Sequence, residues 1–189
     1  LWVPGETNFT GEVIGLLEQF STDCGKPSIH FFGHTHGYSR GQSIEHSHAM
    51  VNVATAGGSI DYWGEYLQAD YPEYSVSQDE WGFVIVEVDA GSDPKFTVKR
   101  ISRGDELNPL DNVLRDEFTI RIHNDMPSTP SAVYPSGDMV APDLIWLWGS
   151  EFYDLDNDDH GYSHWQISTD CNDFQSPIRA IYESHENWY

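Results

Sequence analysis

The chain has 189 residues, of which 31 are acidic and nine are basic, so its formal net charge is −22. A balance this negative argues against nucleic acids and anionic membranes as partners, because those need clustered lysine and arginine. No apolar run is long enough for a membrane span. A hydrophobic content of 39% is typical of a folded protein with one domain, or one domain and a small module.

The first elements in chain order are a helix and a strand. An amphipathic helix is predicted over 10–20 with Thr10 as its N-cap, and Gly25 and Pro27 end it. A short buried strand follows over 28–32. This helix–turn–strand order is typical of the layers of α/β proteins. The apolar stripe expected to face the core contains Val13, Leu16, Leu17 and Phe20.

Gly33-His34-Thr35-His36 directly follows the predicted strand and would bring two imidazoles to the rim of a sheet. Neutral imidazole is a common ligand of zinc, iron and manganese, so the pattern predicts His34 and His36 as metal ligands. The alternative is a pair of turn histidines that are hydrogen-bonded to the backbone. Gly57 and Gly58 later permit a close backbone approach, and residues 61–63 after them form either a pocket wall or ordinary packing.

Further strands are predicted on both sides of a change in composition. A linker rich in Pro, Ser and Thr is expected over 125–135. After it, acidic loops and short apolar runs predict the beginning of a β-sandwich module over 136–189. The strands before the linker are predicted over 50–54, 81–88, 95–101 and 118–122, and those after it over 144–148 and 164–168.

The segment Gly33-His34-Thr35-His36-Gly37-Tyr38-Ser39-Arg40, with the strand before it, resembles the last motif of calcineurin-like metallophosphoesterases. It is most similar to the purple acid phosphatase branch. The resemblance implies an α/β fold, a four-layer βαβα sandwich of which residues 1–124 would be the C-terminal portion. It also implies a centre of two metal ions (Fe, Zn or Mn) at the sheet edge, with His34 binding one ion and His36 the other.

The same resemblance implies a function. A secreted or cell-surface enzyme of this kind would hydrolyse phosphate mono- or diesters through a hydroxide bound to the metals. The family's Asp-x-His, Gly-Asp and Gly-Asn-His blocks and a further upstream histidine have no counterpart in the chain. We therefore expect a fragment that is inactive alone and whose partner is the missing N-terminal part. The alternative is a non-catalytic extracellular structural or adhesive protein that retains a phosphoesterase-like scaffold.

Four residues near the motif are candidates for contact with a phosphate ester. His46 and His48 would lie on one face of a strand, where they form an extra site, protonate a leaving group or belong to an exposed edge. Tyr38 and Arg40 follow the motif at positions where an anion could be met. Arg40 either binds phosphate through its guanidinium or forms a salt bridge with one of the many acids. His30, within the strand, is expected to be a core histidine.

Two features outside the motif leave alternatives open. Asp154, Asp156 and Asp158 alternate in the oxygen-rich arrangement that calcium favours, although an ordinary acidic loop would have the same pattern. Cys24 and Cys171 are far apart in sequence and either form one long-range disulfide or remain two thiols.

Overall fold

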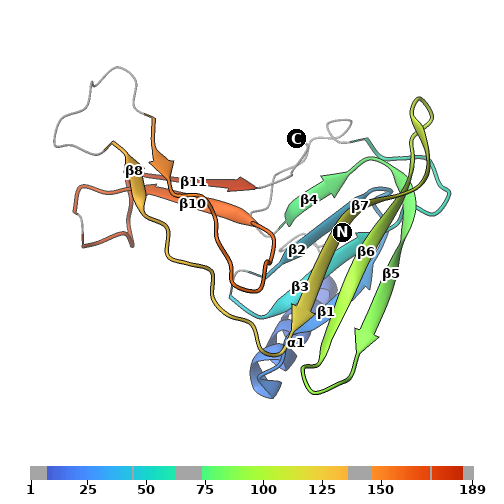
Figure 1. Cartoon of the computed structure of the whole chain (residues 1–189), viewed down its shortest axis with the longest axis horizontal. Coiled ribbons are helices and arrows are strands. Elements are labelled where there is room, and N and C mark those ends of the chain that lie inside the picture. Colours follow the sequence, from blue (N-terminus) through green and yellow to red (C-terminus); the bar gives the residue numbers. More distant parts are fainter. Residues whose placement is uncertain (1–7, 44, 63–73, 136–145, 171, 185–189) are drawn as a thin grey trace. The chain divides into compact units, whose positions relative to one another are not determined.

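The structure is a computed structural model that describes residues 8–43, 45–62, 74–135, 146–170 and 172–184 (Figure 1). This part of the chain contains one helix and eleven strands. The elements are α1 (Asn8–Cys24), β1 (Ser28–Phe32), β2 (Tyr38–Gln42), β3 (His48–Val53), β4 (Tyr74–Gln78), β5 (Trp81–Asp89), β6 (Lys95–Gly104), β7 (Pro109–Arg121), β8 (Ala132–Tyr134), β9 (Trp148–Gly149), β10 (Tyr162–Ile167) and β11 (Arg179–Ser184).

The chain divides into two compact units. The first contains Leu1–Ile122 together with Gly161–Tyr189, and the second is His123–His160. The two units are defined by the contacts within each of them. This division does not test the expected linker over 125–135 or the expected module over 136–189, which stay predictions. No helix in the described part of the chain has the length and apolar character needed to cross a membrane.

Helix α1 ends in a Schellman motif. Gly25 has a φ of 58°, in the left-handed region that glycine adopts without strain. The Gly25 N–H donates to the Thr22 carbonyl, and the Lys26 N–H donates to the Ser21 carbonyl, both at 3.2 Å. Pro27 then prevents further helix, and β1 begins at Ser28, as the sequence predicted.

The buried face of α1 differs from the predicted apolar stripe. Ile14 and Ser21 are buried, whereas Val13, Leu16 and Phe20 are each more than half exposed. The buried positions are seven residues apart, which is two helical turns, so they lie on one face. The side that contacts the sheet is therefore rotated away from the most apolar side of the helix.

The first unit contains a mixed sheet with the order β1-β3-β2-β4. β1 and β3 are parallel, with Ser28 opposite His48 and Phe32 opposite Asn52, and the other neighbours are antiparallel. β3 extends the predicted strand by two residues at its start. The sequence analysis predicted neither β2 nor β4, because both carry polar residues or glycine: Arg40 and Gly41 in β2, and Ser75, Ser77 and Gln78 in β4.

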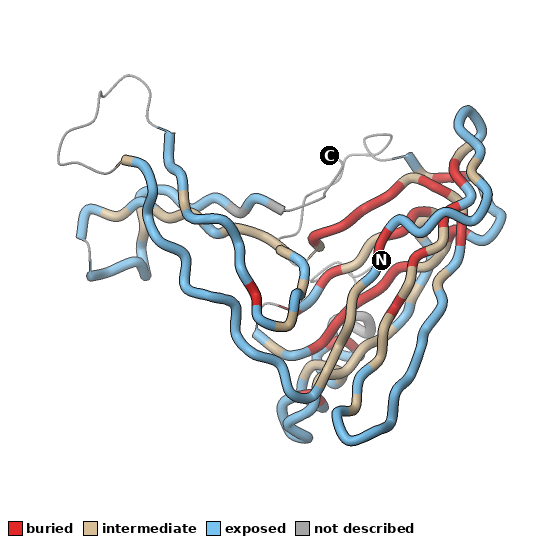
Figure 2. Tube along the Cα trace, viewed as in Figure 1, coloured by how far each residue is buried: buried red, intermediate tan, exposed pale blue. Residues whose placement is uncertain are grey.

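A second sheet, β5-β6-β7, is an antiparallel meander that packs on the first. The core between them contains Tyr38, Val51 and Val76, with Val84 and Phe118 from the meander packed against it. Figure 2 shows buried residues concentrated along β3 and β4. Since β3 has a neighbour on either side and is buried along nearly its whole length, it is the central strand of the core.

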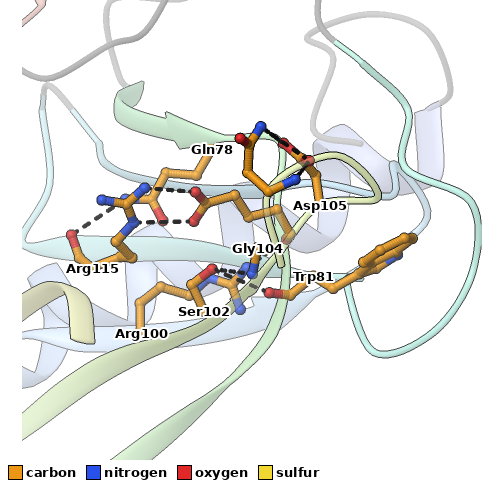
Figure 3. Close-up of polar contacts among 9 residues, drawn as sticks. Gln78, Trp81, Arg100, Ser102, Gly104, Asp105 and Arg115 are labelled. Carbon is orange, nitrogen blue, oxygen red and sulfur yellow. Dashed lines mark hydrogen bonds and ion pairs between the residues drawn. The ribbon is translucent and has the colours of Figure 1, made fainter. Parts of the chain in front are cut away.

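Charged side chains also join the two sheets. Arg100 on β6 is fully buried, donates to the Glu80 carbonyl at 2.6 Å and lies over the Tyr38 ring at 5.0 Å. Arg115 on β7 donates to both carboxylate oxygens of Glu80, at 2.7 and 3.3 Å (Figure 3). Burial would raise the pKa of Glu80, but hydrogen bonds from Arg115 and Ser102 outweigh it and lower that pKa.

The expected four-layer βαβα sandwich is wrong. Within the described residues only α1 is helical, and small β-sheets make up most of the structure. The helix–turn–strand order predicted over 10–32 suggested α/β layers, but the parallel strands β1 and β3 are connected through the antiparallel strand β2 and not through a helix. In the described residues from the expected linker onward, the strands form two two-stranded sheets, β8–β9 and β10–β11, and the β-sandwich module over 136–189 stays a prediction.

Candidate metal-binding loop

The loop over 33–37 connects β1 to β2 at one edge of the mixed sheet. Because β1 and β3 are parallel, Asn52 near the end of β3 lies at the same edge, and its Nδ2 donates to the Thr35 carbonyl at 2.9 Å. The Gly37 N–H donates to the same carbonyl, also at 2.9 Å. The loop is therefore held from within and from the neighbouring strand.

His36 is fixed by the segment that follows β3. Its backbone N–H donates to Asp61 Oδ2 at 2.9 Å, and its carbonyl accepts the Asp61 N–H at 3.0 Å. The imidazole Nδ1 lies 2.8 Å from the Ser59 carbonyl oxygen. A carbonyl only accepts, so Nδ1 carries a proton, and in the neutral ring Nε2 then has the free lone pair. This is the tautomer in which a histidine binds a metal through Nε2.

Glycine at position 58 makes room for this imidazole. A Cβ on Gly58 would lie 3.0 Å from His36 Cε1 and 3.1 Å from Nδ1, closer than ordinary van der Waals contact. The Gly58 carbonyl accepts the indole N–H of Trp81 at 2.8 Å, which ties this segment to the start of β5. The ring therefore lies directly against backbone.

His34 is exposed and has a φ of 117°. This backbone conformation is unfavourable for a residue with a Cβ, and such strain is concentrated at functional sites. Together with His36, which is partly exposed, it gives a short loop with two accessible imidazoles. The two predicted metal ligands thus lie on one loop, and both imidazoles are at least partly exposed.

His46 and His48 lie at the opposite edge of the same sheet. His48 is opposite Ser28 at the start of β1, whereas the loop follows Phe32 at its end. Four strand residues separate these edges by about 13 Å. His48 is fully buried, and His46 is hydrogen-bonded through Nδ1 to Thr22 Oγ1 at 2.8 Å. The structure does not bring these histidines to the loop.

Tyr38 and Arg40 point into the core between the sheets and not toward solvent. The Tyr38 hydroxyl donates to Asp116 Oδ2 at 2.6 Å, and Arg40 makes a two-point pair with the same carboxylate, at 2.6 and 2.9 Å. The Arg40 guanidinium also lies over the Phe118 ring at 4.8 Å. Burial, then the charge of Asp116, raise the pKa of the Tyr38 phenol. Of the two interpretations of Arg40, the salt bridge is the one that the structure contains.

In the acidic loop of the second unit, carboxylates of Asp154 and Asp156 accept hydrogen bonds from backbone N–H groups of the same unit. Asp154 is buried, and its Oδ1 accepts the N–H groups of Asp156 and Asp158 at 2.7 and 3.3 Å. Asp156 Oδ2 accepts the Asp125 N–H at 2.7 Å. These contacts are those of an Asx turn, and calcium at this loop stays a prediction.

Other residues singled out in the sequence are placed as follows. Tyr62 is exposed, while Trp63 and Cys171 lie outside the described residues. Cys24 is an exposed free thiol. In the part of the chain that the structure describes, no group of three or more His, Cys, Asp or Glu side chains is arranged to hold a metal ion.

The residues that the sequence interpretation missed are the ones that support the loop. Ser59 was not considered, Asp61 was considered only as a pocket wall or packing, and Trp81 only as the start of a strand, yet all three contact His36 or the segment against it. One signal was available: Asp61 follows the double glycine after the predicted strand over 50–54, at the sheet edge where the motif was expected. The contact of His36 with Ser59 is made by a backbone carbonyl, so the side-chain type at position 59 gives no sign of it.

Comparison with known proteins adds no relative. No family model matches the chain, and no curated protein or solved structure is significantly similar to it.

Proposed function

We propose that the chain is part of a metal-dependent phosphoesterase and that His34 and His36 are two of its metal ligands. The observation that carries the proposal is the His36 imidazole, whose Nδ1 proton is donated to the Ser59 carbonyl while Nε2 is left as a ligand. The exposed, strained His34 two residues earlier supports it. An extracellular location belongs to the proposal and rests on the sequence resemblance.

The residues present fit metal ions of the zinc, iron and manganese group. Imidazole nitrogens suit such borderline ions, and two accessible rings on one loop can serve one ion each. When bound, a pair of these ions supplies Lewis-acid stabilisation of a phosphate ester. The described residues hold no larger ligand cluster, so the proposal requires further ligands from elsewhere in the protein.

The chain's own contribution is to orient the ligands. Asn52 holds the Thr35 carbonyl between the two histidines, and Ser59 and Asp61 hold His36. Preorganised ligands keep their geometry without reorganisation when an ion or a substrate arrives. Arg40 and Tyr38 act on Asp116 and have no place in substrate binding in this proposal.

The test uses the protein as its source produces it, with His34→Ala and His36→Ala as variants and the exposed His123→Ala as control. Bound metal is measured by elemental analysis, and activity by hydrolysis of p-nitrophenyl phosphate and bis-p-nitrophenyl phosphate. Each loop variant is expected to lose bound metal and at least about 100-fold in activity, since even supporting residues at metal sites contribute 10- to 100-fold. Unchanged metal content and activity in both loop variants contradict the proposal.

A further inference from the structure

We infer that Asp61 is a positioning residue for His36 and that it fixes the ring in the Nδ1–H tautomer together with the Ser59 carbonyl. The inference deepens the proposed function, on which it rests for the identity of the ligand as a metal ion. The tautomer itself is a property of the metal-free chain.

Three hydrogen bonds connect His36 to residues 59–61. Two are reciprocal, from the His36 N–H to the Asp61 carboxylate and from the Asp61 N–H to the His36 carbonyl, at 2.9 and 3.0 Å. The third is the 2.8 Å contact of Nδ1 with Ser59. Because the first two fix the backbone of both residues, they determine where the Ser59 carbonyl stands relative to the ring.

The Asp61 carboxylate also faces the imidazole itself. Its Oδ1 lies 4.0 Å from His36 Nδ1, too far for a hydrogen bond but on the side of the protonated nitrogen. The Asp61 side chain is 29% exposed and that of His36 is 44% exposed, so both stand at the surface with the ring the more open. The second carboxylate oxygen therefore favours a proton on Nδ1 over one on Nε2.

The segment that carries Asp61 is anchored at the start of β5. The Gly82 N–H donates to the Thr55 carbonyl, and the Thr55 hydroxyl donates to the Gly82 carbonyl, both at 3.1 Å. Trp81 adds its bond to the Gly58 carbonyl. Because these hydrogen bonds attach the segment to β5, the positions of Ser59 and Asp61 relative to His36 are restrained by the second sheet.

The first measurement is made on the metal-free chain. A long-range ¹H–¹⁵N spectrum at about pH 8, above the usual histidine pKa, reports which ring nitrogen of His36 carries the proton. The wild type is expected to show the Nδ1–H form. Asp61→Ala should shift His36 to a mixture of tautomers. Asp61→Asn keeps an acceptor for the His36 N–H but loses the second carboxylate oxygen, so it should retain most, but not all, of the wild-type preference. Asp93→Ala removes an exposed carboxylate elsewhere and is the charge-matched control.

The second measurement is a Zn²⁺ titration of the same proteins. Asp61→Ala is expected to weaken binding by about 10- to 100-fold, and Asp61→Asn to restore most of it. If Asp61→Ala does not fold, Trp81→Phe removes only the bond to Gly58 and must loosen the tautomer preference in its place.

Two results overturn the inference. One is a wild-type tautomer in Asp61→Ala, and the other is a changed tautomer with unchanged Zn²⁺ affinity. Failure of the proposed function is recognised separately: His34→Ala and His36→Ala would then leave Zn²⁺ binding unchanged, while the tautomer measurement would still report on Asp61.

Discussion

Asp116 is the residue to which both Tyr38 and Arg40 point. Its side chain is only 3% exposed, that of Arg40 is 13% exposed, and the phenol donates to the same carboxylate. An arginine and a carboxylate that are both buried depend on each other, because either one alone would be a buried charge without a partner. We regard this cluster as a structural element of the core between the sheets.

Asp116→Ala is therefore expected to lower the free energy of unfolding by about 3–5 kcal/mol, as is typical when one partner of a buried ion pair is removed. Urea denaturation measures it. Glu87→Ala is the matched control, because Glu87 pairs with Lys99 at 2.6 Å on an exposed face, where ion pairs contribute little. If both variants lost the same free energy of unfolding, the buried Asp116 ion pair would stabilise the fold no more than an exposed one, which contradicts the prediction.

At this scale the sequence showed the loop and not its partners. A strand followed by Gly33-His34-Thr35-His36 is a local pattern, and the structure does have an ordered loop there. Asp116 lies 76 positions from Arg40, and Ser59 lies 23 positions from His36. Which of 31 acidic residues meets Arg40 depends on how two sheets pack, and no local pattern contains that information.

A chain of hydrogen bonds connects three elements, α1, β1 and β3. The hydroxyls of Ser21 and Ser28 contact each other, Ser28 Oγ lies 2.7 Å from His48 Nδ1, and His48 Nε2 lies 2.8 Å from His30 Nδ1. The two rings are also stacked, with centroids 5.0 Å apart. One ring nitrogen of the pair must accept, so protonation of both rings would break this bond.

This arrangement predicts a loss of stability in acid. Burial, then the neighbouring His48, lower the pKa of His30 to about 4 against the opposing charge of Glu18. Burial also lowers the pKa of His48, with Glu18 opposing and His46 adding. The unfolded chain titrates near the usual value of about 6.5, so it binds more protons than the folded chain between about pH 6.5 and 4.

The stabilisation from His30 is therefore complete above about pH 6.5 and decreases toward pH 4, by at most about 1.4 kcal/mol per pH unit. Urea midpoints across this range measure it, and hydrogen exchange of α1 reports whether the helix opens first. His30→Gln should flatten the dependence, whereas His123→Gln should not. A wild-type slope in His30→Gln would show that other groups cause the acid transition.

Helices and strands were predicted well where the segment had a single clear hydrophobic pattern. The strand over 28–32 has the predicted bounds, and those over 81–88 and 95–101 were found nearly as predicted, because each is a bounded apolar or alternating run. The prediction of the buried face of α1 was wrong, because that face depends on which side of the helix packs against the sheet. Ser21 is polar but buried, and its hydroxyl contacts that of Ser28.

The charge of the whole molecule sets its response to salt. Among its nine basic residues, Arg40, Lys99 and Arg115 are engaged in ion pairs and Arg100 is fully buried, whereas the chain has 31 acidic residues. Nine basic residues cannot neutralise 31 carboxylates, so a large excess of negative charge remains. Such self-repulsion destabilises the compact state, and it decreases as ions screen it.

We expect the urea midpoint of unfolding to increase from about 0.1 M to 1 M NaCl, over which the Debye length falls from about 10 Å to 3 Å. Repeating the series with KCl separates screening from binding of a particular cation. A constant or decreasing midpoint would show that the few ion pairs matter more than the excess of negative charge.

The exposed apolar stripe of α1 means that salt also affects how molecules of this protein associate. Val13, Leu16 and Phe20 form an apolar patch on a molecule whose copies otherwise repel one another. Screening weakens the repulsion between molecules as well as within them, while contact between two such patches needs no charge. We therefore expect the salt concentrations that stabilise the fold also to promote association through this patch, so a buffer has to be chosen with both effects in view.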